Sequence, residues 1–66
     1  MNWVLVYQTS DVFVFEQVKL LLDANDIEFN IRNTVSSMYN NFGSYEIYVT
    51  SESEILAKKI IQDAVG

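Results

Sequence analysis

The sequence predicts an α+β sandwich in which two helices cover one face of a three-stranded sheet. Two segments, 27–33 and 44–50, alternate between apolar and other side chains, as half-buried strands do. Residues 11–25 and 51–64 instead carry apolar side chains at helical spacing. With a short β-branched and aromatic run at 3–7, the element order is β-α-β-β-α within a single domain, 1–66.

The run at 3–7 predicts the first strand, because it is β-branched or aromatic and polar residues follow it. Trp3, Leu5 and Tyr7 alternate with Val4 and Val6. We expect the first set to face the helices and the two valines to lie on the outer face of the sheet.

The segment 11–25 predicts a helix that begins after Asp11, which can act as the N-cap. Its end is expected at Asn25, a residue that tolerates the left-handed C-cap conformation. The expected core face comprises Val14, Val18, Leu21 and Leu22, with Phe15 at its edge.

The two alternating segments form the second and third strands, joined by a polar loop at 34–43. Arg32 and Glu46 are expected to be cross-strand neighbours on the outer face. Gly43, at the end of the loop, is expected to take a positive φ. The second helix follows at once, and Ser51 with Glu54 predicts a capping box at its start.

This order of elements matches a ferredoxin-like sandwich that lacks the fourth strand, with sheet order 1-3-2. The first and second strands should run parallel, because a right-handed helical crossover joins them. The first strand is then an edge, and residues 3–7 contain no Lys, no Pro and no sign of a bulge that would protect it. The predicted core comprises Leu5, Val14, Val18, Leu21, Ile27, Phe29, Ile31, Ile47, Val49, Leu56, Ile60 and Ile61.

Composition excludes several kinds of chemistry. The chain has no Cys and no His, so disulfides, His/Cys zinc sites and Cys or His catalysis are impossible, and Ser36 and Ser37 have no His to activate them. We expect no catalytic, cofactor-binding or metal-binding residues, and no enzymatic activity. The net charge of −5 disfavours nucleic acid and anionic membranes as partners. No membrane span or signal peptide is visible, so a cytoplasmic location is expected.

Several short segments resemble the DUF2007 family of small bacterial signal-transducing domains with a PII-like (GlnB-like) fold. They are the opening at 3–7, the helix end and turn at 21–27, the loop at 36–43, the strand at 45–49 and the helix at 57–61. The sequence departs from the family pattern at Val35, where members often carry an acid, and at 53–55, where Ser-Glu-Ile replaces an acid followed by Ala. The resemblance implies a fold and a regulatory role, and it carries over no catalytic residue.

The apolar side chains outside the core suggest an interaction surface. Val4, Val6 and Tyr48 are expected on the uncovered sheet face, Trp3 on the open edge, and Tyr39 and Phe42 in the loop. We therefore predict a small regulatory or protein-interaction module that forms a homodimer through its sheet. The alternative is a sensor that binds a metabolite or nucleotide near the loop at 34–43.

Overall fold

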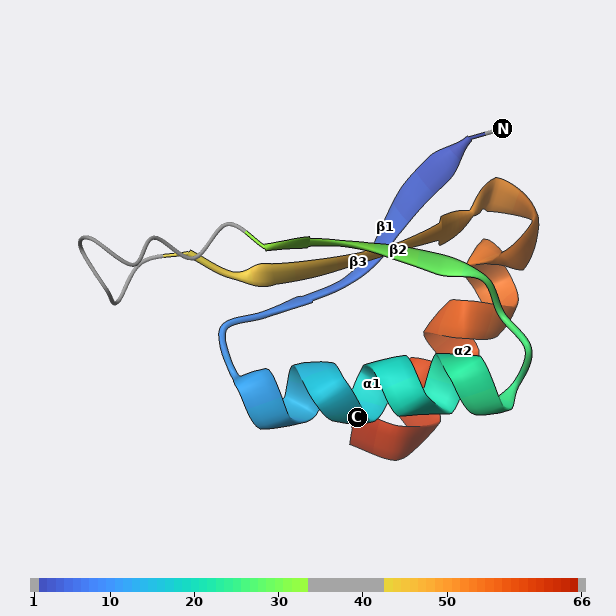
Figure 1. Ribbon diagram of the computed structural model, residues 1–66. Coiled ribbons are helices and arrows are strands. Elements are labelled where there is room, and N and C mark those ends of the chain that lie inside the picture. Colours follow the sequence, from blue (N-terminus) through green and yellow to red (C-terminus); the bar gives the residue numbers. More distant parts are fainter. Residues whose placement is uncertain (1, 34–42, 66) are drawn as a thin grey trace.

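A computed structural model describes residues 2–33 and 43–65, and within them it confirms the predicted order of elements. Strand β1 (Trp3–Thr9) leads into helix α1 (Val12–Ala24), and strands β2 (Phe29–Asn33) and β3 (Tyr45–Thr50) follow. A short 3-10 turn, η1 (Ser51–Ser53), then runs directly into helix α2 (Glu54–Val65). Both helices lie on the same side of the sheet (Figure 1).

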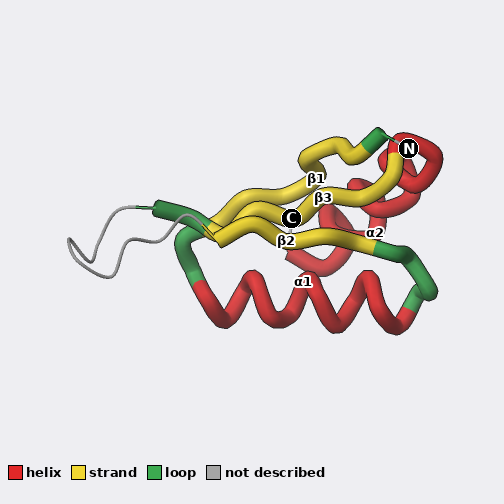
Figure 2. The backbone as a smooth tube through the Cα atoms, turned by 45° about the horizontal axis from the view of Figure 1, so that its top comes forward, coloured by secondary structure: helices red, strands yellow, loops and turns green. Residues whose placement is uncertain are grey.

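The sheet has the predicted order β1-β3-β2, with β3 antiparallel to both neighbours. Strands β1 and β2 therefore run parallel to each other without touching, as a helical crossover between them requires. The helices form one layer and the sheet the other (Figure 2). The predicted fold class, a three-stranded α+β sandwich with one bare sheet face, is confirmed.

Strand β1 contains a β-bulge, so Trp3 and Leu5 point away from the helices, contrary to the prediction, whereas Tyr7 faces them as predicted. Val4 pairs with the buried Val49, which places Val4 toward the helices, and Leu5 consequently points outward. The register then shifts, so that Tyr7 pairs with Ile47 and also faces inward. One extra residue thus changes the phase of alternation along the strand.

The core lies between the sheet and the two helices. Its buried side chains are Phe15, Val18, Leu22, Ile27, Ile47, Val49, Ala57 and Ile61. Val4, Val6, Tyr7, Val14, Phe29, Tyr45 and Ile60 pack against this cluster while remaining partly exposed.

Four predicted core residues do not lie in the core. Leu5 is displaced by the bulge, and Leu21 is only half-buried because the buried side of α1 centres on Val18 and Leu22. Ile31 is 48% exposed although it pairs with the buried Ile47, because β2 is an edge strand and the helices approach β1 more closely. The α2 side chains at 57 and 61 form the buried contacts, and Leu56 points to solvent.

Helix α1 begins as predicted. The Asp11 carboxylate accepts hydrogen bonds from the amides of Phe13 (2.8 Å) and Val14 (3.3 Å), two of the donors that a helix start leaves unpaired.

The end of α1 differs in one respect from the prediction. Asn25 is the C-cap, but its φ is −100°, and the left-handed residue is Asp26 with φ 58°. The amides of Asp26 and Ile27 donate back to the carbonyls of Asp23 (3.1 Å) and Leu22 (2.9 Å). This is a Schellman motif, and its usual apolar contact is made by Leu22 and Ile27, both buried in the core cluster.

The predicted capping box at the second helix does not form. The amide of Glu54 donates to the backbone carbonyl of Ser51 and not to its hydroxyl, because Ser51 already lies within the 3-10 turn. The Glu54 carboxylate binds Lys58, one turn ahead, at 2.7 Å. Gly43, by contrast, has the predicted positive φ, 125°.

Candidate functional site

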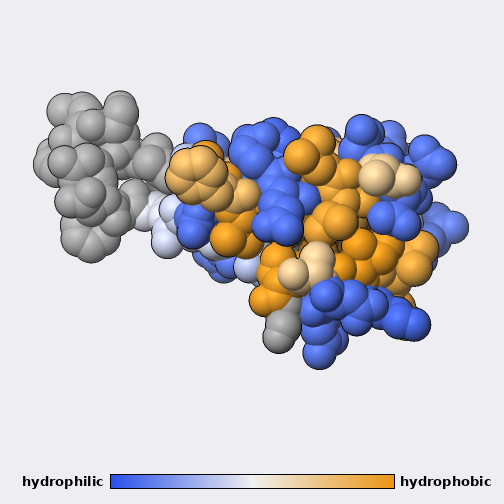
Figure 3. Space-filling model, turned by 90° about the horizontal axis from the view of Figure 1, so that it is seen from below, coloured by the Kyte–Doolittle hydropathy of each residue, from blue (hydrophilic) through white to orange (hydrophobic). Residues whose placement is uncertain are grey.

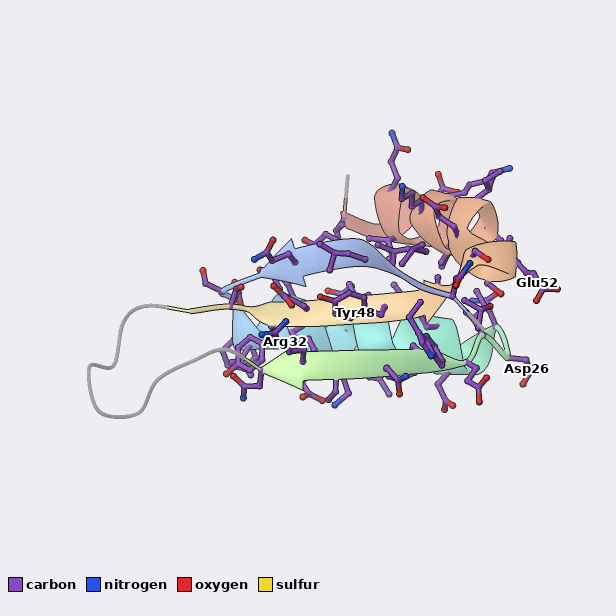
Figure 4. All side chains as sticks on the ribbon, turned by 90° about the horizontal axis from the view of Figure 1, so that it is seen from above. Asp26, Arg32, Tyr48 and Glu52 are labelled. Carbon is purple, nitrogen blue, oxygen red and sulfur yellow. The ribbon has the colours of Figure 1, made fainter. Side chains whose placement is uncertain are left out.

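The face of the sheet turned away from the helices, here called the outer face, is the candidate site. Strand register determines which side chains share it, because residues paired across strands point the same way. Two cross-strand rows follow from the pairs on β3: Leu5–Tyr48–Asn30 and Gln8–Glu46–Arg32, with Trp3 beside Thr50 at one end. Figure 4 looks directly onto this face and shows Tyr48 near its middle and Arg32 toward the end that leads into the β2–β3 connection.

Three apolar or aromatic side chains meet on the outer face, and we call them the outer patch: Trp3, Leu5 and Tyr48. Leu5 lies directly opposite Tyr48, and Trp3 is two residues from Leu5 on the same side of β1. Trp3 and Leu5 are 37% and 41% exposed, and Tyr48 is half-buried. No described helix or loop covers the outer patch (Figures 1 and 4).

A hydrogen-bonded polar row borders the outer patch. The Tyr48 hydroxyl donates to Glu46 Oε1 at 2.8 Å. Gln8 Nε2 donates to Ser44 Oγ at 2.7 Å and lies 3.5 Å from Glu46 Oε2. Arg32 is the cross-strand neighbour of Glu46, as predicted.

Glu46 also determines the protonation of Tyr48. The hydrogen bond to the carboxylate favours the neutral phenol, and desolvation and the negative charge of Glu46 act in the same direction, so the pKa of Tyr48 is raised above 10.0. Arg32 opposes this shift. The phenol therefore stays neutral, and able to donate to Glu46, to a higher pH than an ordinary tyrosine does.

The structure brings some of the predicted interaction residues together and separates others. Trp3 and Tyr48 both lie on the outer face. Val4 and Val6 do not: both are half-buried and pack against the core, so the prediction that they line the outer face is wrong. Tyr39 and Phe42 lie outside the described residues. Leu5 was missed because nothing in the residues 3–7 marks a bulge.

The edge of β1 is also less open than predicted. The bulge between Leu5 and Tyr7 interrupts the regular spacing of backbone groups that a docking strand needs. The expectation of an unprotected edge is therefore wrong, and the outer face is the stronger candidate for association.

The described residues form neither a ligand pocket nor a metal site. No pocket is found among them, and no three carboxylates gather where they could hold a metal ion. Within residues 2–33 and 43–65, neither helix has the length and apolar character needed to cross a membrane. The loop at 34–43, at which the alternative prediction placed a metabolite or nucleotide, falls mostly outside the described part of the chain.

Searches with the whole chain against protein-family models, curated protein sequences and solved structures find no match in any of the three.

Proposed function

We propose that the chain is a small, non-enzymatic regulatory or protein-interaction module of the cytoplasm that forms a homodimer through its outer face. The observation that carries this proposal is the outer patch: Trp3, Leu5 and Tyr48 lie side by side on a sheet face that no described element covers. A cluster of aromatic and aliphatic side chains with a polar border is typical of a contact surface. The resemblance to DUF2007 domains supports the regulatory part of the proposal.

Face-to-face packing suits this geometry better than pairing of strand edges. The bulge in β1 breaks the regular edge, whereas on the outer face Leu5, Tyr48 and Asn30 remain aligned across all three strands. Two such faces related by a two-fold axis would bury both outer patches in one sheet-on-sheet contact. The polar row of Gln8, Glu46 and Arg32 would then form part of the rim.

The size of the face predicts a weak dimer. Three strands about 4.8 Å apart and about 17–20 Å long span roughly 250 Å² in projection. A stable interface buries about 800 Å² of accessible surface per partner, several times this footprint, so we expect a weak contact even though side chains add accessible area to the flat projection. The two net charges of −5 also repel each other, although salt screens that repulsion beyond about 8 Å at physiological ionic strength. We expect a dissociation constant of about 100 μM, decreasing as salt is added.

Sedimentation equilibrium of the wild type and of Leu5→Lys tests the proposal. Leu5 is the appropriate position because its side chain is exposed beside Tyr48, so a lysine there disturbs the contact and not the core. We expect a monomer–dimer equilibrium in the wild type between about 10 μM and about 1 mM, and a monomer throughout in Leu5→Lys.

Ile55→Lys is the matched control, because Ile55 is 85% exposed on α2, in the helical layer and not on the outer face. It should dimerise like the wild type. A wild type that remains monomeric at about 1 mM would refute self-association, and a dimer insensitive to Leu5→Lys would refute the assignment to the outer face.

A further inference from the structure

Helix α1 presents a second apolar surface, on the side facing away from the sheet. Phe13 and Leu20 are 84% and 69% exposed, among the most exposed large apolar side chains of the described chain. They are seven residues apart, so two helical turns bring them to within about 20° of the same direction. With Gln17 and Ala24 they form a line along the helix that we call the α1 stripe, opposite the buried Phe15, Val18 and Leu22. Seen from the helical side, apolar surface over α1 alternates with polar side chains (Figure 3).

The α1 stripe contributes little to folding. Phe is an indifferent helix former, and at this exposure its ring buries almost no surface. The first turn is instead held by the Asp11 cap, whose carboxylate accepts from the Phe13 and Val14 amides. Exposed apolar side chains at i and i+7 of one helix have the spacing by which amphipathic helices contact a partner.

Acidic side chains line one side of the α1 stripe and stand at its two ends. Glu16 follows Phe13 by three residues and Asp23 follows Leu20 by three, so both acids lie along the same side of the stripe. Asp11 and Asp26 stand at the two ends of the helix. The only base of α1 is Lys19. Its amine binds Glu16 Oε2 at 3.3 Å and lies 5.0 Å from the ring centroid of Phe15, on the core side of the helix.

We propose that the α1 stripe binds a basic amphipathic helical segment of another protein. Two apolar side chains of such a segment would pack on Phe13 and Leu20. Its Lys or Arg residues would face Asp23, and also Glu16, whose carboxylate Lys19 already binds at 3.3 Å. A second copy of α1 fits poorly, because antiparallel pairing would place these acids against their own equivalents. The stripe and the outer patch lie on opposite layers, so this proposal does not depend on dimerisation through the sheet.

The test uses the full chain and a synthetic helical peptide of three heptads, about 21 residues, with Leu at positions a and d and Lys elsewhere. Amide chemical shifts of the ¹⁵N-labelled protein locate the contact, and anisotropy of the labelled peptide measures its affinity. We expect shifts confined to α1, and weaker binding as salt is raised. The variant Phe13→Ser/Leu20→Ser should weaken binding at least about tenfold.

Ile55→Ser provides the matched control, because Ile55 is as exposed as Phe13 but lies on α2. It should bind the peptide like the wild type, and a peptide with Glu in place of Lys should not bind. All variants should keep the wild-type melting temperature to within a few degrees, since exposed positions contribute little to stability.

Several results would overturn the proposal. One is equal affinity of the double Ser variant and the wild type, and another is equal binding of a peptide with the same composition but scrambled Leu positions. A wild-type dimer that Phe13→Ser dissociates would identify a second copy as the occupant. Binding to neutral lipid vesicles that the double variant loses, without peptide binding, would identify a membrane surface instead.

Discussion

Replacing Asp26 with glycine is expected to stabilise the protein. Asp26 follows α1 in the left-handed region, with φ 58°, which glycine adopts without steric cost. Its carboxylate also stands at the negative end of the helix dipole. In Figure 4 the side chain points away from the body of the molecule, at the same end as Glu52, so the substitution removes no packing contact.

The change in the free energy of unfolding follows from two contributions that favour glycine and one that opposes it. Left-handed backbone costs a non-glycine residue about 1 kcal/mol, with Asp among the more tolerant. An acid at a helix C-terminus costs about 0.3–1 kcal/mol. Against these, the unfolded chain gains freedom worth about 0.5–1 kcal/mol when glycine replaces another residue. The net expectation for Asp26→Gly is a gain of about 0.5–1 kcal/mol, or about 2–8 °C in Tm for a domain of this size.

Urea denaturation followed by circular dichroism measures this change directly. Asp26→Asn removes the charge and keeps the left-handed tolerance, so it should lie between the wild type and Asp26→Gly. Asp26→Ala removes the charge but not the steric conflict, so it should be the least stable of the three variants. If Asp26→Gly is no more stable than the wild type, or if Asp26→Ala is as stable as Asp26→Gly, the left-handed backbone at residue 26 does not limit stability.

Three further substitutions test the core, the N-cap and the outer face. Leu22→Ala should lower the free energy of unfolding by about 2–5 kcal/mol in urea denaturation, because Leu22 is fully buried. Leu21→Ala should lower it clearly less, because Leu21 is only half-buried, and equal losses would contradict the observed rotation of α1. Asp11→Ala should cost about 1 kcal/mol of unfolding free energy, and an unchanged urea midpoint would mean that water replaces the cap. Glu46→Gln should lower the pKa of Tyr48 toward 10.0 in an ultraviolet absorbance titration read against Tyr48→Phe. Because the pKa of Tyr48 is higher in the folded than in the unfolded state, its contribution to stability is fully present below pH 10.0 and is lost as the pH rises through the folded-state pKa. Glu46→Gln should therefore also reduce the loss of stability at alkaline pH. An unchanged Tyr48 titration in this variant would exclude the hydrogen bond as the cause of the raised pKa.

The pattern of side chains predicts the elements well but the orientation of each element less well. Alternation at 27–33 and the apolar positions of α1 follow from burial on one side, so their existence and type are visible in the sequence. The rotation of α1 is set by what it packs against: of the two leucines expected on its core face, Leu22 is fully buried and Leu21 only half-buried. The exposure of Ile31 depends likewise on where the helices lie across the sheet, which no local pattern encodes.

The outer patch could be predicted only in part. Tyr48 lies on a strand that alternates regularly, so its outward direction follows from its neighbours at 47 and 49. In β1 every residue from 3 to 7 is apolar or aromatic, so the composition does not distinguish one face from the other. The bulge determines which side chains of β1 reach the outer face. It arises from the pairing register between β1 and β3, which are far apart in the chain, so the residues of β1 alone do not predict it.

The position of β3 at the centre of the sheet constrains how the protein can be made. β3 is the last strand in the chain, yet it pairs with both others, and its partners in β1 precede it by about 40 residues. At about 5–20 residues per second, a ribosome leaves β1 without its partner for several seconds. Neither β1 nor the β1–α1 pair has a sheet to join until β3 emerges, so folding should be late, cooperative and limited by long-range loop closure. During that interval the apolar β1 is the segment most in need of a chaperone.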